Sequence, residues 1–278
     1  MSDVPVVSSL WIGPKFSFLE KLCMTSFIDA GHPTKLYTYA PVQNVPDGVE
    51  VCDANEILPC ADPDAVLAAG LAAQHSDRFR YILLSKTDEI WVDTDAYCLR
   101  QFPKAPYMFS CHFKDLVANG VLRLPKESPT LQSLIAFTDT EYPDLPDDFP
   151  YLRRTVRAEY AARRDAGDPM HVGELPWEIW GPFALTYFLR MHGEIDHRLP
   201  SEVLYPLGGS EIVRTLWKRR RIQITMPPNT LSVHFYGSSL RTQVKRRDGA
   251  VPPKSYLGRL CTKHGIDPSS PELMIRPD

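Results

Sequence analysis

Two aspartates, Asp93 and Asp95, stand one residue apart directly after an apolar run at residues 90–92. In an extended chain, residues i and i+2 project from the same face, so both carboxylates can reach one ligand while Thr94 points away. Two converging carboxylates repel each other unless a cation lies between them, and Mg²⁺ or Mn²⁺ prefers such oxygen ligands. A bare Asp-x-Asp pattern is most often a solvated turn, but a solvated turn needs no apolar run before it. We therefore predict a divalent metal site here.

A second group of charged residues precedes this segment. Ser76 is a candidate helix N-cap, and Asp77 would then lie in the first turn, where the helix dipole favours an acid. Arg80 lies three residues further on and therefore on the same helical face as Asp77. Near an acidic cluster, such a pair can hold a polar ligand. The alternative is an ordinary salt bridge along an exposed helix, and the residues alone leave both interpretations open.

The hydrophobic pattern predicts a scaffold of alternating strands and helices for these residues. Strands are predicted at residues 4–12, 35–39, 49–52, 90–92, 107–113, 120–124 and 232–236. Helices are predicted at residues 16–30, 65–86 (in two pieces), 130–137, 151–164 and 182–191, whereas residues 251–278 look loosely structured. Strands that alternate with helices indicate an open α/β sheet, in which ligands bind beyond the carboxyl ends of the strands.

Composition narrows the class of protein. The 278 residues are 44% apolar and 23% charged, and the formal net charge of −3 predicts no nucleic-acid partner. The sequence has no apolar run long enough to cross a membrane, and its first residues lack the features of a signal peptide. Six cysteines without metal-site spacing predict reduced thiols in a cytoplasmic protein. Basic stretches at residues 218–221 and 245–247 are either solvated or contact the inner face of a membrane.

Several short stretches, in order and with matching spacing, resemble glycosyltransferase family 32, whose members carry an Asp-x-Asp motif and include bacterial polysaccharide enzymes. The resemblance is nearly continuous from residue 8 to about residue 103 and weaker afterwards. It is carried by residues 9–13 (SLWIG), 25–27 (TSF), 31–32 (GH), 36–39 (LYTY), 45–49 (VPDGV), 76–81 (SDRFRY) and 91–95 (WVDTD), and later by 119–120 (NG), 181–182 (GP) and 232–234 (SVH).

The resemblance implies a GT-A-type, Rossmann-like α/β fold with a mixed central sheet. It also implies a UDP-sugar donor, Mn²⁺ or Mg²⁺ as cofactor, and transfer to a hydroxyl of a glycan or lipid-linked acceptor with retention of anomeric configuration. We accordingly predict a single glycosyltransferase domain over residues 1–278. Residues 1–125 would form its nucleotide-sugar-binding half, residues 126–250 its acceptor-side half, and residues 251–278 a C-terminal tail.

The same resemblance suggests roles for individual residues. Trp11 would stack on the uracil ring, Asp77 and Arg80 would hold hydroxyls of the donor sugar, and Asn119 would line the sugar site. For Asn119 the alternative is a plain Asn-Gly turn, since this dipeptide is common in turns. For Trp11 the alternative is a core position.

A metal-binding group is implied as well. Asp95 would ligate the metal directly, Asp93 would contact it or the donor's ribose or sugar, and His234 would lie near the metal and the diphosphate. Together with Arg80, the two aspartates are the predicted catalytic residues. For His234 the alternative is a hydrogen-bonded histidine of the core.

Some positions depart from the family pattern. Asp88 and Glu89 replace a Gly-Gly pair before the Asp-x-Asp strand, which puts the shape of that loop in doubt. Trp180 replaces a small residue, and Tyr236 replaces a tryptophan. Both changes bear on which sugar and which acceptor the protein would bind. Glu174 and Glu178 are candidates for an acceptor-orienting carboxylate. The functional alternatives are a catalytically degenerate nucleotide-sugar-binding protein and a metal-dependent hydrolase of nucleotide-sugars.

Overall fold

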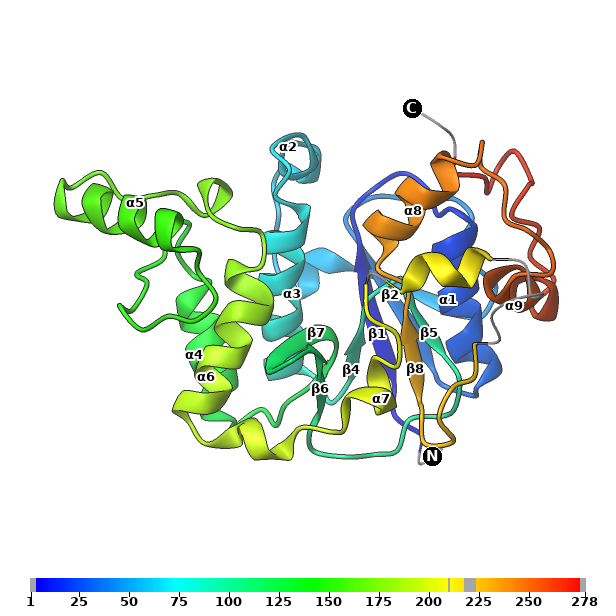
Figure 1. Cartoon of the computed structure of the whole chain (residues 1–278), viewed down its shortest axis with the longest axis horizontal. Coiled ribbons are helices and arrows are strands. Elements are labelled where there is room, and N and C mark those ends of the chain that lie inside the picture. Colours follow the sequence, from blue (N-terminus) through cyan, green and yellow to red (C-terminus); the bar gives the residue numbers. More distant parts are fainter. Residues whose placement is uncertain (1–3, 210, 218–223, 276–278) are drawn as a thin grey trace.

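A six-stranded sheet forms the centre of the protein, which a computed structural model describes over residues 4–209, 211–217 and 224–275 (Figure 1). Its strand order is β3-β2-β1-β4-β7-β6. The first four strands in this order run parallel, whereas β7 is antiparallel to β4 and β6 is antiparallel to β7. The strands are β1 (Val7–Trp11), β2 (Thr34–Thr38), β3 (Val49–Asp53), β4 (Ile90–Val92), β6 (Met108–Phe113) and β7 (Leu116–Arg123). The predicted α/β fold with a mixed central sheet is confirmed.

Helices cover both faces of this sheet. Helix α1 (Phe18–Asp29) packs on one side with α9 (Tyr256–Lys263) behind it, and α3 (Ala72–Lys86), α4 (Pro129–Phe137) and α6 (Ala184–Met191) pack on the other (Figure 1). A two-stranded antiparallel ribbon of β5 (Ala96–Cys98) and β8 (Ser232–His234) lies against α1. The remaining helices are α2 (Pro63–Ala68), α5 (Arg154–Asp165), α7 (Ser201–Leu204) and α8 (Gly237–Lys245).

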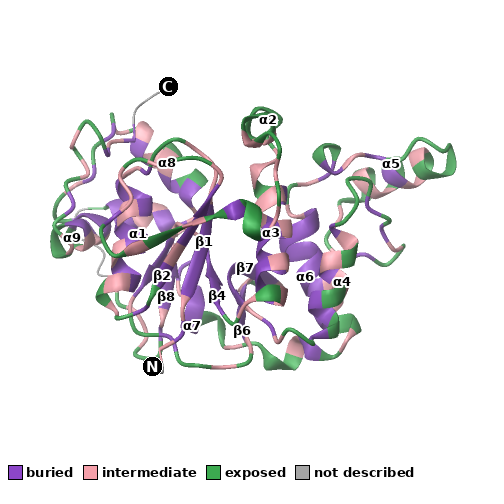
Figure 2. Ribbon diagram, turned by 180° about the vertical axis from the view of Figure 1, so that it is seen from behind, coloured by how far each residue is buried: buried purple, intermediate pink, exposed green. Residues whose placement is uncertain are grey.

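The two faces have different hydrophobic clusters. One joins Phe79 of α3 and Trp91 of β4 to α4 and α6, and the other joins α1 to β8, α8 and α9. The central strands are buried along most of their length, whereas α2 is exposed (Figure 2). Because β1 and β4 are buried on both faces, the polar segments at their carboxyl ends are held in a fixed place. The fixed position of these two segments is what brings the candidate site residues together.

The C-terminal segment corrects one expectation. Residues 251–275 are not loosely structured, because they contain α9 and return to pack on α1. Ser255 caps α9 by accepting the N–H of Gly258, and Leu257 and Cys261 are buried on one face of the helix. This spacing of apolar residues behind a serine is a helix-start signal that can be read in the sequence. All six cysteines are free thiols, as predicted.

Candidate active site

Asp93 and Asp95 lie on a tight turn between β4 and β5. The N–H of Asp93 donates to the carbonyl of Gly120 at 2.7 Å, and the N–H of Ala96 donates back to the carbonyl of Asp93 at 2.9 Å. The expectation of an extended chain, with Thr94 pointing away, is therefore wrong, and Thr94 also lines the site cavity. A turn places both carboxylates at the carboxyl end of β4, because the chain reverses there to begin β5.

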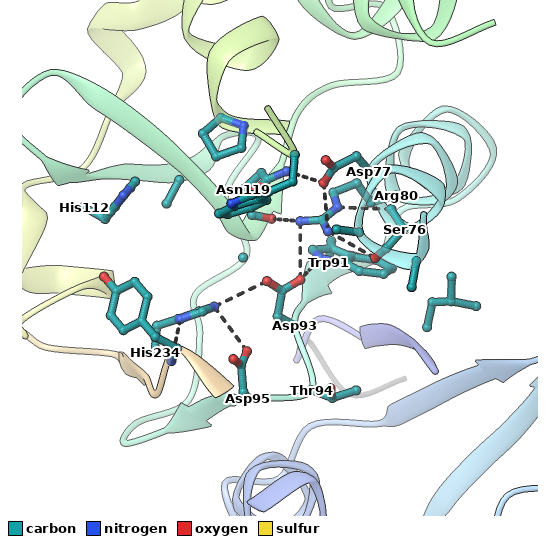
Figure 3. A pocket seen from close by; sticks show the side chains of 18 of the residues that line it. Ser76, Asp77, Arg80, Trp91, Asp93, Thr94, Asp95, His112, Asn119 and His234 are labelled. Carbon is teal, nitrogen blue, oxygen red and sulfur yellow. Dashed lines mark hydrogen bonds and ion pairs between the residues drawn. The ribbon is translucent and has the colours of Figure 1, made fainter. Parts of the chain in front are cut away.

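His234 joins the two aspartates from the neighbouring strand. His234 pairs with Ala96 in the β5–β8 ribbon. Its Nε2 lies 3.3 Å from Asp93 Oδ2 and 3.2 Å from Asp95 Oδ1 (Figure 3). Burial opposes a charge on His234, but the carboxylates of Asp95 and Asp93 outweigh it and raise its pKa above the usual value. The hydrogen-bond partners of His234 are therefore the two carboxylates of the Asp-x-Asp motif.

These three residues fit a metal ion. One ligand atom from each, two carboxylate oxygens and an imidazole nitrogen, lie within 4.8 Å of one another. The other oxygen of Asp95 accepts the N–H of Gly237, which orients the carboxylate. The N–H of Tyr236 donates to His234 Nδ1 at 3.2 Å, so the neutral ring carries its hydrogen on Nε2. The two carboxylates are therefore ready to ligate a hard cation, and His234 ligates only if the Tyr236 contact is released.

A buried guanidinium links this group to α3. Arg80 is 4% exposed, and its Nη1 lies 3.3 Å from Asp93 Oδ1 while its Nη2 lies 3.1 Å from Asp77 Oδ1. Nη1 also donates to the carbonyl of Asn119 at 2.6 Å, and the guanidinium lies 4.7 Å from the ring centroid of Trp91. The predicted Asp77–Arg80 pair exists, but it is not an exposed helix salt bridge.

Ser76 does not cap α3, which begins four residues earlier at Ala72. Its hydroxyl accepts from Arg80 Nη2 at 3.1 Å and its carbonyl accepts from Arg80 Nε at 3.2 Å. Ser76 therefore orients the guanidinium from within the helix. The sequence suggested a cap because serine before an acid is typical of one, whereas Leu71 precedes the helix without a side-chain cap.

Asp77 and Asn119 meet beside Arg80. The Asn119 amide donates to Asp77 Oδ1 at 2.7 Å, and Asp77 Oδ2 is buried without a hydrogen-bond partner. Burial raises the pKa of Asp77 to about 7, against the opposing effect of Arg80. Asn119 lies inside β7 and is not part of a turn. The backbone of Gly181 passes so close that a Cβ would lie 2.7 Å from Asp77 Oδ2.

The residues predicted to bind the donor and the metal all line one cavity of about 400 Å³ (Figure 3). Trp11 forms part of its wall at the end of β1 and extends into two adjoining pockets, and its Nε1 is buried without a partner. Trp11 thus packs on the cluster of Phe16, Met24 and Leu36 and also lines the cavity. The cavity lies beyond the carboxyl ends of β1 and β4, where α/β sheets bind ligands.

The departures from the family pattern lie mostly away from this cavity. Glu89 is buried at the opposite end of β4, where it accepts from the Ser8 hydroxyl at 2.5 Å and pairs with Lys35 at 2.9 Å. Trp180 packs in the core and does not line the cavity. Glu174 is exposed and pairs with Arg163, and Glu178 is not among the lining residues. Glu174 therefore lies away from the cavity. Glu178 is near enough to Asp77 for its charge to contribute to the raised pKa of that carboxyl, and its role as an acceptor-orienting group stays a prediction.

The cavity also contains residues that the sequence analysis did not assign to it. They are His112, Trp177, Tyr205 and Arg241, together with Tyr236, whose family departure was noted. Arg241 forms an ion pair with the buried Glu20 of α1, and both residues line an adjoining pocket. The hydroxyl of Tyr205 accepts the N–H of Val121 at 2.9 Å, which fixes the ring in the wall of the cavity. These residues come from distant segments that only the fold brings together, so they carry no local sequence signal.

Gly120 provides the space for the carboxylate–histidine group. A Cβ at this position would lie 2.6 Å from His234 Nε2 and 2.9 Å from Asp93 Oδ2. We expect Gly120→Ala to displace His234 and to weaken Mn²⁺-assisted UDP binding about tenfold, with a loss of about 1–3 kcal/mol in folding free energy from overpacking. Calorimetric titration checks this. Gly208→Ala is the matched control, because its nearest atom would be 3.9 Å away. Equal UDP affinity in both variants would contradict the assignment.

The basic stretches can be placed only in part. Residues 218–221 lie outside the described residues, whereas residues 245–247 lie at the end of α8. Arg247 Nη1 donates to the carbonyl of Gln243 at 2.7 Å. Within the described ranges, every helix is too short or too polar to cross a membrane.

Comparisons with known proteins give little support beyond this geometry. No protein-family model matches the sequence, and no curated protein matches it. One solved structure, the PaToxG glycosyltransferase, is similar with a TM-score of 0.42 and 13% identity, covering 70% of this chain and 73% of that chain. Another, a transferase with two cysteine-to-serine substitutions, has a TM-score of 0.33 and 9% identity over 60% of this chain and 86% of that chain. Both are transferases, but likenesses of this size do not confirm family 32, and the function must rest on the site.

Proposed function

We propose that this protein is a metal-dependent glycosyltransferase that moves a sugar from a UDP-sugar to a hydroxyl of a glycan or lipid-linked acceptor. The observation that carries the proposal is the convergence of two charged groups on one cavity. The carboxylates of Asp93 and Asp95 with His234 form one group, and the Asp77–Arg80 pair forms the other. Arg80 joins them through Asp93.

The chemistry of the walls supports one arrangement of the donor. The uracil ring would stack on Trp11, whose unpartnered Nε1 can donate to a polar atom of the nucleotide. The diphosphate would lie at Asp93 and Asp95 through the metal. The donor sugar would then reach Asp77 and Asn119, where Asp77 Oδ2 is available to a sugar hydroxyl.

Asp93 and Asp95 would hold the cation, Mn²⁺ or Mg²⁺, and both residues keep an oxygen that faces His234. When bound, the metal supplies positive charge that stabilises the diphosphate as it leaves. His234 would donate Nε2–H toward the same place. Arg80 pairs with Asp93 and adds a fixed positive charge to the site.

In the proposed reaction, a bond forms between the acceptor oxygen and the anomeric carbon, and the bond from that carbon to UDP breaks with its electron pair going to UDP. The acceptor hydroxyl gives up its proton. Retention of configuration means that the acceptor attacks from the side on which UDP departs. We assign no protein nucleophile. We further propose that residues 1–125 bind the donor and that residues 126–250 contribute the acceptor side. The protein would work in the cytoplasm, and a lipid-linked acceptor would bring it to the inner face of the membrane.

Metal-dependent nucleotide binding and turnover test this function. We expect UDP, but not UMP, to raise the melting temperature clearly when MnCl₂ is present and only slightly when EDTA is present, because the diphosphate needs the cation. We also expect release of UDP from at least one of UDP-glucose, UDP-galactose and UDP-N-acetylglucosamine. Binding without any release would favour the degenerate binding protein. If UDP is released but the sugar is always transferred to water and never to an added sugar acceptor, the hydrolase is favoured. The absence of UDP binding would contradict the proposal.

A further inference from the structure

The wall of the cavity opposite Asp77 and Arg80 contains two polar side-chain atoms without a hydrogen-bond partner. Figure 3 shows His112 on that side, across the cavity from Ser76 and Asp77. Nδ1 of His112 and the hydroxyl of Tyr236 are both buried and both lack a hydrogen-bond partner. The two ring centroids are 6.3 Å apart. Buried polar atoms are normally satisfied, so two unsatisfied ones in one wall indicate a missing ligand.

The backbone aims both side chains at this wall. The pairing of β6 with β7 shifts register between Cys111 and Phe113, so His112 occupies the irregular position. Such bulges re-aim a side chain and are common beside active sites. Tyr236 has a φ of +48°, which is uncommon for a residue with a side chain. It is the N-cap residue of α8 and lies two residues after His234, the last residue of β8.

The charge state of His112 suits a proton acceptor. Burial lowers its pKa below the usual value, and the positive charge of His234 lowers it further. The ring is therefore neutral near pH 7 and has a free nitrogen lone pair. The aromatic rings of Tyr205 and Tyr236, with centroids 6.3 Å from that of His112, surround it with apolar faces. Apolar ring faces next to isolated polar atoms are suited to a carbohydrate.

We propose that His112 and Tyr236 bind the attacking hydroxyl of a carbohydrate acceptor, or water in its absence, and that His112 takes its proton. The inference rests on the proposed glycosyl transfer. Attack with retention brings the acceptor oxygen to the side where the diphosphate leaves, and Tyr236 lies 4.7 Å from His234 between ring centroids. The new bond joins this oxygen to the anomeric carbon, the electron pair of the broken bond leaves with UDP, and the proton passes to His112 Nδ1 and then to solvent.

Donor hydrolysis tests this without knowledge of the acceptor, using Mn²⁺ and the UDP-sugar that the wild-type protein hydrolyses. We expect His112→Leu to lower kcat about a hundredfold while the Kd for the UDP-sugar changes less than about twofold. His112→Asn keeps a hydrogen-bond acceptor near the position of Nδ1 but cannot take a proton, so it should lose as much. Tyr236→Phe, which removes only the hydroxyl, should lower kcat about tenfold.

The controls separate this role from a structural one. His197→Gln replaces an exposed histidine that stacks on Tyr107 outside the cavity, and it should leave kcat unchanged. Weaker binding of the UDP-sugar in the His112 variants would make His112 a donor contact and overturn the inference. Near-normal kcat in His112→Asn would overturn the proton transfer. If the wild-type protein hydrolyses no UDP-sugar while UDP binds with Mn²⁺, the proposed transfer is wrong and this inference falls with it.

Discussion

Arg80→Ala is expected to destabilise the protein by about 3–5 kcal/mol, because it leaves two carboxylates without their buried partner. The side chains of Arg80 and Asp77 are 5% and 4% exposed, and Asp93 loses the same partner. Arg80 also donates to the carbonyl of Asn119, so its loss removes a hydrogen bond from that buried residue. Urea denaturation of the variant measures the free energy of unfolding.

Arg78→Ala is the matched control on the same helix. Arg78 pairs with Asp139, whose side chain is 76% exposed, so its loss should cost less than about 1 kcal/mol. If Arg78→Ala and Arg80→Ala have similar small effects, the buried network is not formed in solution. The double variant Asp77→Asn/Arg80→Ala should recover part of the lost stability, because one of the unpaired charges is then absent.

Arg80→Lys separates stability from catalysis. Lysine keeps the positive charge but cannot reproduce the planar set of donors that reaches Asp77, Asp93 and the Asn119 carbonyl together. We expect the variant to fold, to bind UDP with Mn²⁺, and to lose turnover of the UDP-sugar by about a hundredfold or more. Turnover close to that of the wild type would show that Arg80 has only a structural role.

Asp95→Asn is expected to weaken Mn²⁺-assisted UDP binding by at least about tenfold, or roughly 1.4 kcal/mol, and to lower turnover by a larger factor. The amide oxygen can still accept the N–H of Gly237, so α8 should stay in place. The variant loses the negative charge that holds the cation. Folding should therefore change little while metal and diphosphate binding fall together.

Calorimetric titration of UDP with and without MnCl₂ measures the effect for Asp95→Asn and for a control, Asp139→Asn. Asp139 is an exposed acid that pairs with Arg78 outside the cavity. Replacing it should leave UDP affinity unchanged. A dependence on Mn²⁺ that survives in Asp95→Asn would place the cation elsewhere. An affinity that falls equally in both variants would indicate a general effect of negative charge and would argue against a specific ligand.

Much of the scaffold is determined locally and was predictable. The positions of β1, β4 and the two pieces formed by α2 and α3 were predictable, because apolar runs in strands and apolar stripes on helices are encoded in short windows. Asp77 and Arg80 are three residues apart on one helix, so their pairing follows from helical geometry alone. The Asp-x-Asp motif follows an apolar strand and is equally local.

Tertiary structure decided what surrounds these residues. The same Asp77–Arg80 spacing suits an exposed pair, and only the approach of β7 and Gly181 buries it and couples it to Asp93. Asp93 and Asp95 converge through a turn and through His234, which is 139 residues beyond Asp95 in the sequence. His112 reaches the cavity because of a register shift between two strands. Contacts between residues distant in the chain depend on the packing of whole elements, and no short window of sequence contains that information.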